Sequence, residues 1–283
     1  MATLTGLVLA GSRGEGDPLA RTQAVRHRAL LEVCGEPMLL RVLRTLRASP
    51  RLGKLVVSID EPSAAAAVPE IAAWVEAGEL TLHRSLSSPS RSVSDVLEQL
   101  GEAGPLLVTT ADHALLDAPM LDCFLDASEH SSADLLVGVV SRSVLEARFP
   151  GAPRTYLRFR DDAYSGANLF SFRTGKAREV ALFWRRAEKL RKQPWRLVST
   201  FGPVALTLFL LRRLTLAAAL ARASRAIGAE VEAVPLPFAE AAVDVDKPED
   251  LALVSELLAQ RESESSDQRR RSPAAAKPPS AGW

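Results

Sequence analysis

The stretch "LVLAGSRGEGDPLARTQAVRHRALLEVCGEPML", residues 7–39, indicates the class of fold. It opens on a short apolar run typical of a buried strand, Leu7–Ala10, and ends on a Gly-x-Pro that begins a helical pattern over Pro37–Ala48. Glycines and arginines occupy the segment between the two. In an open α/β sheet the loop after the first strand lies at the ligand-binding edge. The stretch therefore predicts a ligand loop that directly follows the first strand of such a sheet.

The alternation of apolar runs and helical patterns continues along the chain. It predicts strands at Leu55–Ile59, Leu80–His83, Leu106–Thr110 and Leu135–Val140, and helices at Ser63–Ala77, Ser92–Leu100 and Pro119–Ser128. Later segments predict strands at Thr155–Phe159, Ala167–Phe172 and Val231–Pro235, and helices over most of 174–227 and from Pro248 to Gln260. Strands that alternate with helices form βαβ units, so we expect an α/β fold with a mostly parallel sheet and helices on both faces.

Composition bounds the class of protein. The chain has 283 residues, of which 47% are hydrophobic, and its 35 basic and 34 acidic side chains leave a net charge of +1. Such a balance indicates no nucleic-acid partner. Two cysteines, Cys34 and Cys123, are too few for a disulfide framework, and no secretory leader or membrane-spanning stretch is evident. We therefore expect a cytoplasmic protein.

Two segments differ from the rest in composition. Residues 262–283 are rich in charge, Ser, Pro and Ala, so we expect one domain over residues 1–261 and a disordered tail after it. Residues 176–214 form a basic and then apolar helical insertion that contains Trp184 and Trp195. A basic solvated helix followed by a buried one explains this pattern. A cap over the site, an oligomer contact or a peripheral membrane contact explains it too.

The loop after the first strand has the chemistry of a phosphate site. Gly11, Gly14 and Gly16 allow backbone N–H groups to converge on an anion, and Arg13 and Arg28 offer planar forks that suit phosphate. The sequence "GSRGEG" fits neither the dinucleotide fingerprint nor the P-loop, which disfavours both classes of enzyme. A solvated connection remains the alternative.

Four stretches in order resemble the MobA-like NTP transferases: "LVLAGSRG…HRALLEVCGEPMLLRVLRTL", "LLVTTADHALL" at 106–116, "SGANLFSF" at 165–172 and "AVDVDKPEDLALV" at 242–254. This resemblance implies a three-layer Rossmannoid, GT-A-like fold. It also implies transfer of NMP from an NTP to a small phosphorylated acceptor, with release of pyrophosphate and a requirement for Mg²⁺. Ser12 stands where the family has a second glycine, and Arg28 stands where it has a lysine.

The resemblance also assigns the catalytic and metal-binding residues. Asp112, at the end of a predicted strand, and Asp246 are the expected metal ligands, and Asp246 is preferred over Asp244. For Asp246 the alternative is a cap on the helix that begins at Pro248. The expected catalytic residues are Arg28, Asp112 and Arg13, where both arginines bind the triphosphate.

Nucleotide and acceptor contacts follow from the same pattern. The nucleotide contacts are expected at Ala10, Gly11, Ser12, Gly14 and Ser92. For Ser92 a helix cap is the alternative. The acceptor contacts are expected at His113 and Asn168, for which the alternatives are an exposed loop residue and an Asn at a bend.

Two other functions remain open at this stage. A nucleotide-sugar glycosyltransferase of similar fold is disfavoured because the D-x-D at 244–246 comes late in the chain. A nucleotide-binding protein that has lost its chemistry is favoured by Ser12 and Arg28 and disfavoured by the retained aspartates. The leading prediction is a nucleotidyltransferase of the cytidylyl or guanylyl type, with its acceptor, pathway and oligomeric state undetermined.

Overall fold

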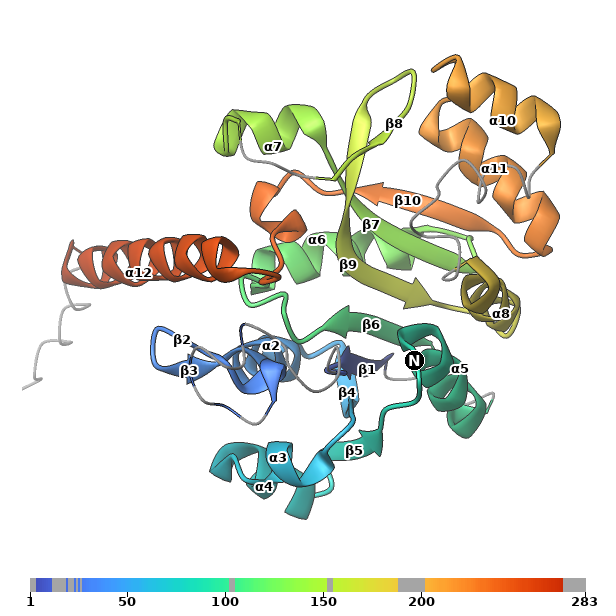
Figure 1. The fold of residues 1–283 in the computed structure, drawn as a ribbon. Coiled ribbons are helices and arrows are strands. Elements are labelled where there is room, and N and C mark those ends of the chain that lie inside the picture. The colour runs from blue at the N-terminus through green and yellow to red at the C-terminus, as the bar shows by residue number, and fades with distance from the viewer. Residues whose placement is uncertain are drawn as a thin grey trace, which may run out of the picture.

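The computed structural model describes residues 4–11, 19, 23, 25, 27–101, 105–151, 155–187 and 202–271. It confirms an α/β fold in which a central, mostly parallel sheet lies between helices (Figure 1). Three predicted site residues, Ser12, Arg13 and Gly14, lie outside the described residues.

Eight strands form the sheet, in the order β10-β7-β9-β6-β1-β4-β5 with β8 paired to β9. Their bounds are β1 Leu4–Leu9, β4 Leu52–Ile59, β5 Leu80–Arg84, β6 Leu106–Thr110, β7 Leu135–Ser141, β8 Leu157–Arg158, β9 Ala163–Phe172 and β10 Val231–Pro235. A separate small hairpin pairs β2 (Glu32–Val33) with β3 (Glu36–Pro37). The parallel strands β1, β4, β5 and β6 bring their carboxyl ends to one edge.

Strand β9 runs antiparallel between β6 and β7. Its register slips where Val137 faces Phe170 but Val139 faces Gly166, so β9 carries a bulge opposite Gly138. Asn168 lies in this bulge with φ of 48°, a left-handed conformation that Asn tolerates better than most residues. The bend anticipated at Asn168 is therefore a bulge inside the sheet.

Helices cover both faces because successive strand residues point to opposite sides. On β1, Val8 packs with one core cluster and Leu7 with another. The first face carries α2 (Met38–Ala48), α3 (Pro62–Ala66), α4 (Pro69–Glu76), α6 (Ala118–His130) and α7 (Arg142–Arg148). The second carries α5 (Pro89–Leu100), α8 (Ala177–Ala187) and α11 (Leu216–Ile227).

The predicted helix over 63–77 is two helices in the structure. Val68, which precedes Pro69, has an extended backbone with φ −82° and ψ 116°, and Pro69 begins α4. A residue before proline avoids the helical region because the proline ring clashes with its backbone. Helix α7 was not predicted at all, since its seven residues are too few to show a helical period.

The final helix, α12, extends over Pro248–Arg271 rather than ending near Gln260. Residues 262–271, which we expected to be disordered, continue it away from the body of the molecule (Figure 1). Acidic residues in its first turn, Glu249 and Asp250, match the helix dipole. Residues 272–283 lie outside the described part of the chain.

The 176–214 insertion contributes α8 and α10 (Pro203–Leu210), and its residues 188–201 lie outside the described part. Among the described helices, none combines the length and the apolar character that crossing a bilayer requires. The described residues also form the 3-10 helices η1 (Arg28–Leu30) and η3 (Ala239–Ala242).

Substitution of Gly138 by Val should lower the free energy of unfolding by about 1–3 kcal/mol, because the β9 bulge leaves no room there. A Cβ on Gly138 would lie 3.2 Å from the Leu169 Cβ and 3.3 Å from the Ala167 Cβ. Chemical denaturation measures the loss. Gly166→Val is the control, since a Cβ there meets nothing within 4 Å, and its effect should stay within about 0.5 kcal/mol. Equal losses in both variants would contradict the packing argument.

Candidate active site

The candidate site lies where β1 and β6 end side by side. Ala111 N donates to Leu9 O at 2.9 Å, and Ala10 N donates to Ser58 O at 2.8 Å, so the chain immediately after each strand is held at the sheet edge. Ala10 is buried and Gly11 is exposed. A small hollow opens there, lined by Leu9, Ala10, Gly11, Arg28, Ala29, Met38, Ala111 and Asp112.

The segment before α12 reaches this edge through one backbone hydrogen bond. Val245 N donates to Asp112 O at 3.1 Å. The side chains of Val243 and Val245 are buried in an apolar cluster, so the alternating aspartates between and after them are directed elsewhere. As a result, Asp112, Asp244 and Asp246 each bring one carboxylate oxygen to a common place, where all three atoms lie within 4.8 Å of one another.

Arg28 lies among these carboxylates. Its Nη2 donates to Asp246 Oδ1 at 2.7 Å and to the Val245 carbonyl, and it lies 3.7 Å from Asp112 Oδ2. The side chain is buried, at the start of η1, where the preceding His27 caps the turn by accepting from Ala29 N. In the structure Arg28 therefore contacts the aspartates, whereas the sequence predicts that it binds a triphosphate.

Burial raises the pKa of the Asp112 carboxyl, and the neighbouring Asp246 carboxylate raises it further. The Thr110 hydroxyl and the Arg28 guanidinium oppose this shift. Within the described part of the chain, Asp112 Oδ1 is buried and accepts no hydrogen bond. A buried carboxylate oxygen that lacks a donor, beside two further carboxylates, fits a divalent cation with oxygen ligands.

The cap of α12 is supplied by Asp250 rather than Asp246. Asp250 Oδ2 accepts from Asp246 N and from Lys247 N, both at 3.2 Å. This carboxylate in the first turn accepts from the N–H of Lys247, directly before the helix, and from that of Asp246, one residue earlier. Asp250 thus has the capping role that was the alternative for Asp246. The Asp246 carboxylate points to Arg28 and the other two aspartates.

Ser92 is buried inside α5, which begins at Pro89, so it is not the cap that the predicted helix start suggested. Its Oγ accepts from Leu86 N at 2.9 Å and closes the loop between β5 and α5. This loop comes close to the chain that follows β1, since a Cβ on Gly11 would lie 3.9 Å from Ser85 Oγ. Ser92 therefore shapes the loop, and the exposed part of the loop faces Gly11.

The two predicted acceptor contacts lie in different environments. Asn168 is partly exposed, in the bulge of β9 beside β6, near the edge where Asp112 lies. His113 is almost wholly buried, and its Nδ1 lies 3.5 Å from Thr109 Oγ1. A side chain without solvent access is not placed to meet a substrate, so the structure speaks against the contact expected for His113.

Sequence reasoning preferred Asp246 over Asp244, but the structure brings both to the cluster. A signal for this was present in "AVDVDKPED", where valines alternate with aspartates. If both valines face a core, both aspartates face away from it on the same side.

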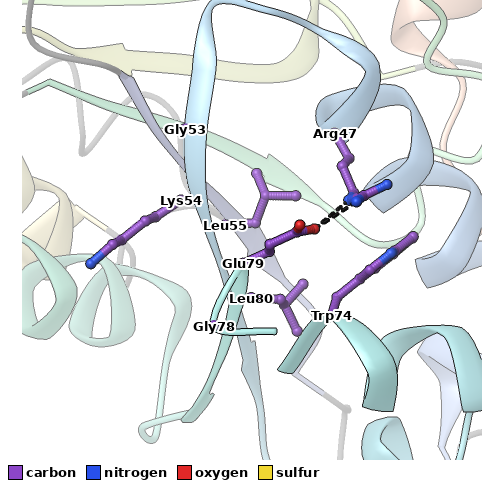
Figure 2. A pocket seen from close by; sticks show the side chains of 8 residues that line it. All are labelled: Arg47, Gly53, Lys54, Leu55, Trp74, Gly78, Glu79 and Leu80. Atoms are coloured by element: carbon purple, nitrogen blue, oxygen red, sulfur yellow. Dashed lines mark hydrogen bonds and ion pairs between the residues drawn. The ribbon is translucent and has the colours of Figure 1, made fainter. Parts of the chain in front are cut away.

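A larger hollow, of about 500 Å³, lies at the opposite edge of the sheet, at the amino ends of β4 and β5 (Figure 2). There Arg47 lies over the Trp74 ring, 5.1 Å from its centroid, and pairs with Glu79 at 2.6 Å. Lys54 points away from this group (Figure 2). Its central cation, Arg47, is already paired with Glu79, so within the described part of the chain Lys54 is the lining cation that has no acidic partner.

Comparison with known proteins agrees with the geometry. The family model for the MobA-like NTP transferase domain matches residues 6–230. A hypothetical transferase from Thermus thermophilus is 32% identical, with a TM-score of 0.71 over 88% of this chain and 99% of that one. No curated protein sequence matches the chain.

Two further solved structures share the fold at low identity. CMP:2-keto-3-deoxy-manno-octonic acid synthetase in complex with CTP is 15% identical, with a TM-score of 0.54 over 92% of this chain and 98% of that one. The 4-diphosphocytidyl-2C-methyl-D-erythritol synthase of Anaerococcus prevotii is 10% identical, with a TM-score of 0.55 over 91% and 98%.

Loss of the α12 cap should destabilise the protein. Asp250→Ala is expected to lower the free energy of unfolding by about 1 kcal/mol, because two N–H groups lose their acceptor. Asp250→Asn, which keeps an acceptor oxygen, should lose less. Glu249→Ala, at an exposed position of the same turn, is the control in the denaturation experiment. If it loses as much as Asp250→Ala, the capping role is wrong.

Burial lowers the pKa of His113 from 6.5 to about 4. Between these values the unfolded chain binds more protons than the folded one, so stability should fall as the pH is lowered through this window. Between pH 7.5 and pH 5, in EDTA, the wild type should lose about 2 kcal/mol more than His113→Leu. His130→Gln, altered at an exposed position of α6, should follow the wild type. Parallel curves for the wild type and His113→Leu would refute this assignment.

Proposed function

The chain belongs to the MobA-like NTP transferase family, and from that premise we propose that it transfers an NMP group from an NTP to a small phosphorylated acceptor, releasing pyrophosphate. The observation that carries the proposal is the convergence of Asp112, Asp244 and Asp246 at the edge where β1 and β6 end. Ligands of open α/β sheets bind at this edge, outside the carboxyl ends of the strands.

Asp112 and Asp246, together with Asp244, would hold Mg²⁺. When bound, the ion neutralises phosphate charge and polarises the α-phosphoryl group. The residues suit this role because three carboxylates with one guanidinium leave an excess of negative charge. The raised pKa of Asp112 fits as well, since a carboxyl whose ionised form is costly gains most from a nearby cation.

Arg28 would act through the carboxylates. Its Nη2 joins Asp246 to the Val245 carbonyl and so fixes the 243–246 segment against η1. A lysine, with one point charge and no planar fork, would hold this arrangement differently. We propose that Arg28 positions Asp246 and supplies positive charge beside the phosphates, and that Arg13 binds them directly.

The nucleotide would lie along Ala10 and Gly11, opposite the loop that Ser92 closes. Gly11 is exposed with open space around it, and its neighbour across the gap is Ser85. Backbone N–H groups there suit phosphate and base contacts. Ser12 and Gly14 remain nucleotide contacts in this proposal, and Ser92 acts by shaping the loop.

The acceptor would approach from the side of β9, where Asn168 offers both a donor and an acceptor. A phosphate acceptor is already ionised at neutral pH, so no general base is required. This agrees with a site whose two nearby imidazoles in the described part of the chain, His113 and the His27 that precedes Arg28, are both buried. Because the two named solved relatives are a CTP complex and a diphosphocytidyl synthase, CTP is the first triphosphate to test, with GTP next.

A second candidate is a nucleotide-binding protein without turnover. The observation in its favour is the ion pair between Arg28 and Asp246, which occupies one of the expected metal ligands. In this case the site would bind a nucleotide through the loop after β1 but release no pyrophosphate.

The test is acceptor-dependent pyrophosphate release with Mg²⁺, across the four ribonucleoside triphosphates and pooled small phosphorylated acceptors. Asp112→Asn should reduce the rate by about 100-fold or more, because the variant holds the cation less well and the negative charge of the transition state is then less stabilised. Asp126→Asn, on the exposed side of α6, is the matched control and should keep the wild-type rate. Full activity of Asp112→Asn would refute the site, and calorimetric nucleotide binding without release from any pool would support the second candidate.

A further inference from the structure

Helix α10 and the adjoining β8 strand carry an apolar surface that the fold leaves exposed. Val204, Leu210 and Leu211 have 65%, 63% and 61% of their surface accessible, and Leu157 on β8 has 49%. Large aliphatic side chains at this level of exposure are a cost to a protein that is surrounded only by water. We use the name apolar face for these four residues.

The two parts of the apolar face belong to one surface. Arg160 N, at the turn between β8 and β9, donates to Leu214 O at 2.9 Å, four residues past the end of α10. The Phe159 ring meets the Phe209 ring edge-on, with centroids 6.1 Å apart. Figure 1 shows α10 and the β8 hairpin projecting together beyond the sheet.

Four arginines lie next to the residues of the apolar face in the sequence, and of these Arg158 has its side chain on the other side of β8 from Leu157. Arg158 and Arg160 adjoin Leu157, and Arg212 and Arg213 follow Leu211 directly. All four are exposed, and within the described part of the chain none of them forms an ion pair. By contrast, many arginines on the opposite side of the molecule pair with acids, as Arg44 does with Glu70.

The acids nearest these four arginines are engaged elsewhere. Asp161 accepts from Leu216 N at 3.1 Å, at the start of α11, and from the Tyr164 hydroxyl at 3.3 Å. Asp162 accepts from the Ser143 hydroxyl and from Ala163 N. These donors are neutral and leave both carboxylates charged, but four arginines outnumber the two aspartates, so the region keeps a net positive charge that can attract an anionic partner.

We propose that the apolar face docks on a bilayer that contains anionic lipid. Exposed aliphatic side chains insert at the level of the headgroups, while the surrounding arginines meet lipid phosphates. An anionic bilayer accounts for both the exposed leucines and the arginines, because its acyl chains bury apolar side chains and its headgroup phosphates, only a few ångströms away, attract positive charge. The proposal concerns this surface alone and holds whether or not the site transfers a nucleotide.

Vesicle flotation with the full-length protein tests the proposal. The wild type should float with vesicles of 70% phosphatidylcholine and 30% phosphatidylglycerol, and bind them several-fold more strongly than pure phosphatidylcholine. High salt should weaken the binding, because it screens the arginines. Leu210→Glu/Leu211→Glu and Arg212→Glu/Arg213→Glu should each reduce the bound fraction about tenfold or more.

Two matched controls lie away from the apolar face. Leu182→Glu alters an exposed leucine on α8, and Lys54→Glu reverses an exposed charge at the opposite edge of the sheet; both should bind as the wild type does. Circular dichroism and a thermal melt establish that each variant is folded. Absence of wild-type flotation, or equal losses in the controls, would overturn the proposal. So would a dimer in light scattering that both double variants dissociate, because a second copy of the chain would then cover the face.

Discussion

The candidate site depends on one backbone hydrogen bond, from Val245 N to Asp112 O. It attaches the segment before the last helix to the end of a central strand. Together with the contacts of Arg28 to Asp246 and to the Val245 carbonyl, it fixes Asp244 and Asp246 relative to Asp112. Burial of Val243 and Val245 protects this bond from water and sets the direction of both aspartates, so a small apolar cluster determines where charge gathers.

Charge balance is the second constraint at this edge. Three carboxylates within a few ångströms repel one another, and burial of Asp112 increases that cost. Arg28 offsets part of it by an ion pair that joins residues 218 positions apart. The remaining negative charge is what makes the edge suitable for a cation and, through it, for a triphosphate. The excess negative charge that destabilises this edge is therefore the same charge that would attract the cation.

The antiparallel strand β9 connects the candidate site to the apolar face. Between β6 and β7 it places Asn168 beside the carboxylate edge, and its bulge leaves little space at Gly138 of the neighbouring strand. At its other end it turns back on β8 and contacts the segment after α10. Strand β9 thus lies beside the candidate site, at the carboxyl ends of the parallel strands β1 and β6, and leads at its other end to the apolar face.

The sequence by itself determined the parallel strands, the helices between them and the position of Asp112, because apolar runs and helical periods are local and the end of a strand can be read from them. It also marked the loop at Gly11. Tertiary structure alone decided that Asp244 joins the cluster, that Arg28 binds aspartates, that Asp250 rather than Asp246 caps α12, and that His113 and Ser92 are buried. The Asp244 and Arg28 contacts join segments far apart in the chain, and pairing across such distances leaves no period in the sequence. The Asp250 cap and the burial of His113 and Ser92 depend on the exact ends of a helix and on packing, which an apolar pattern does not give.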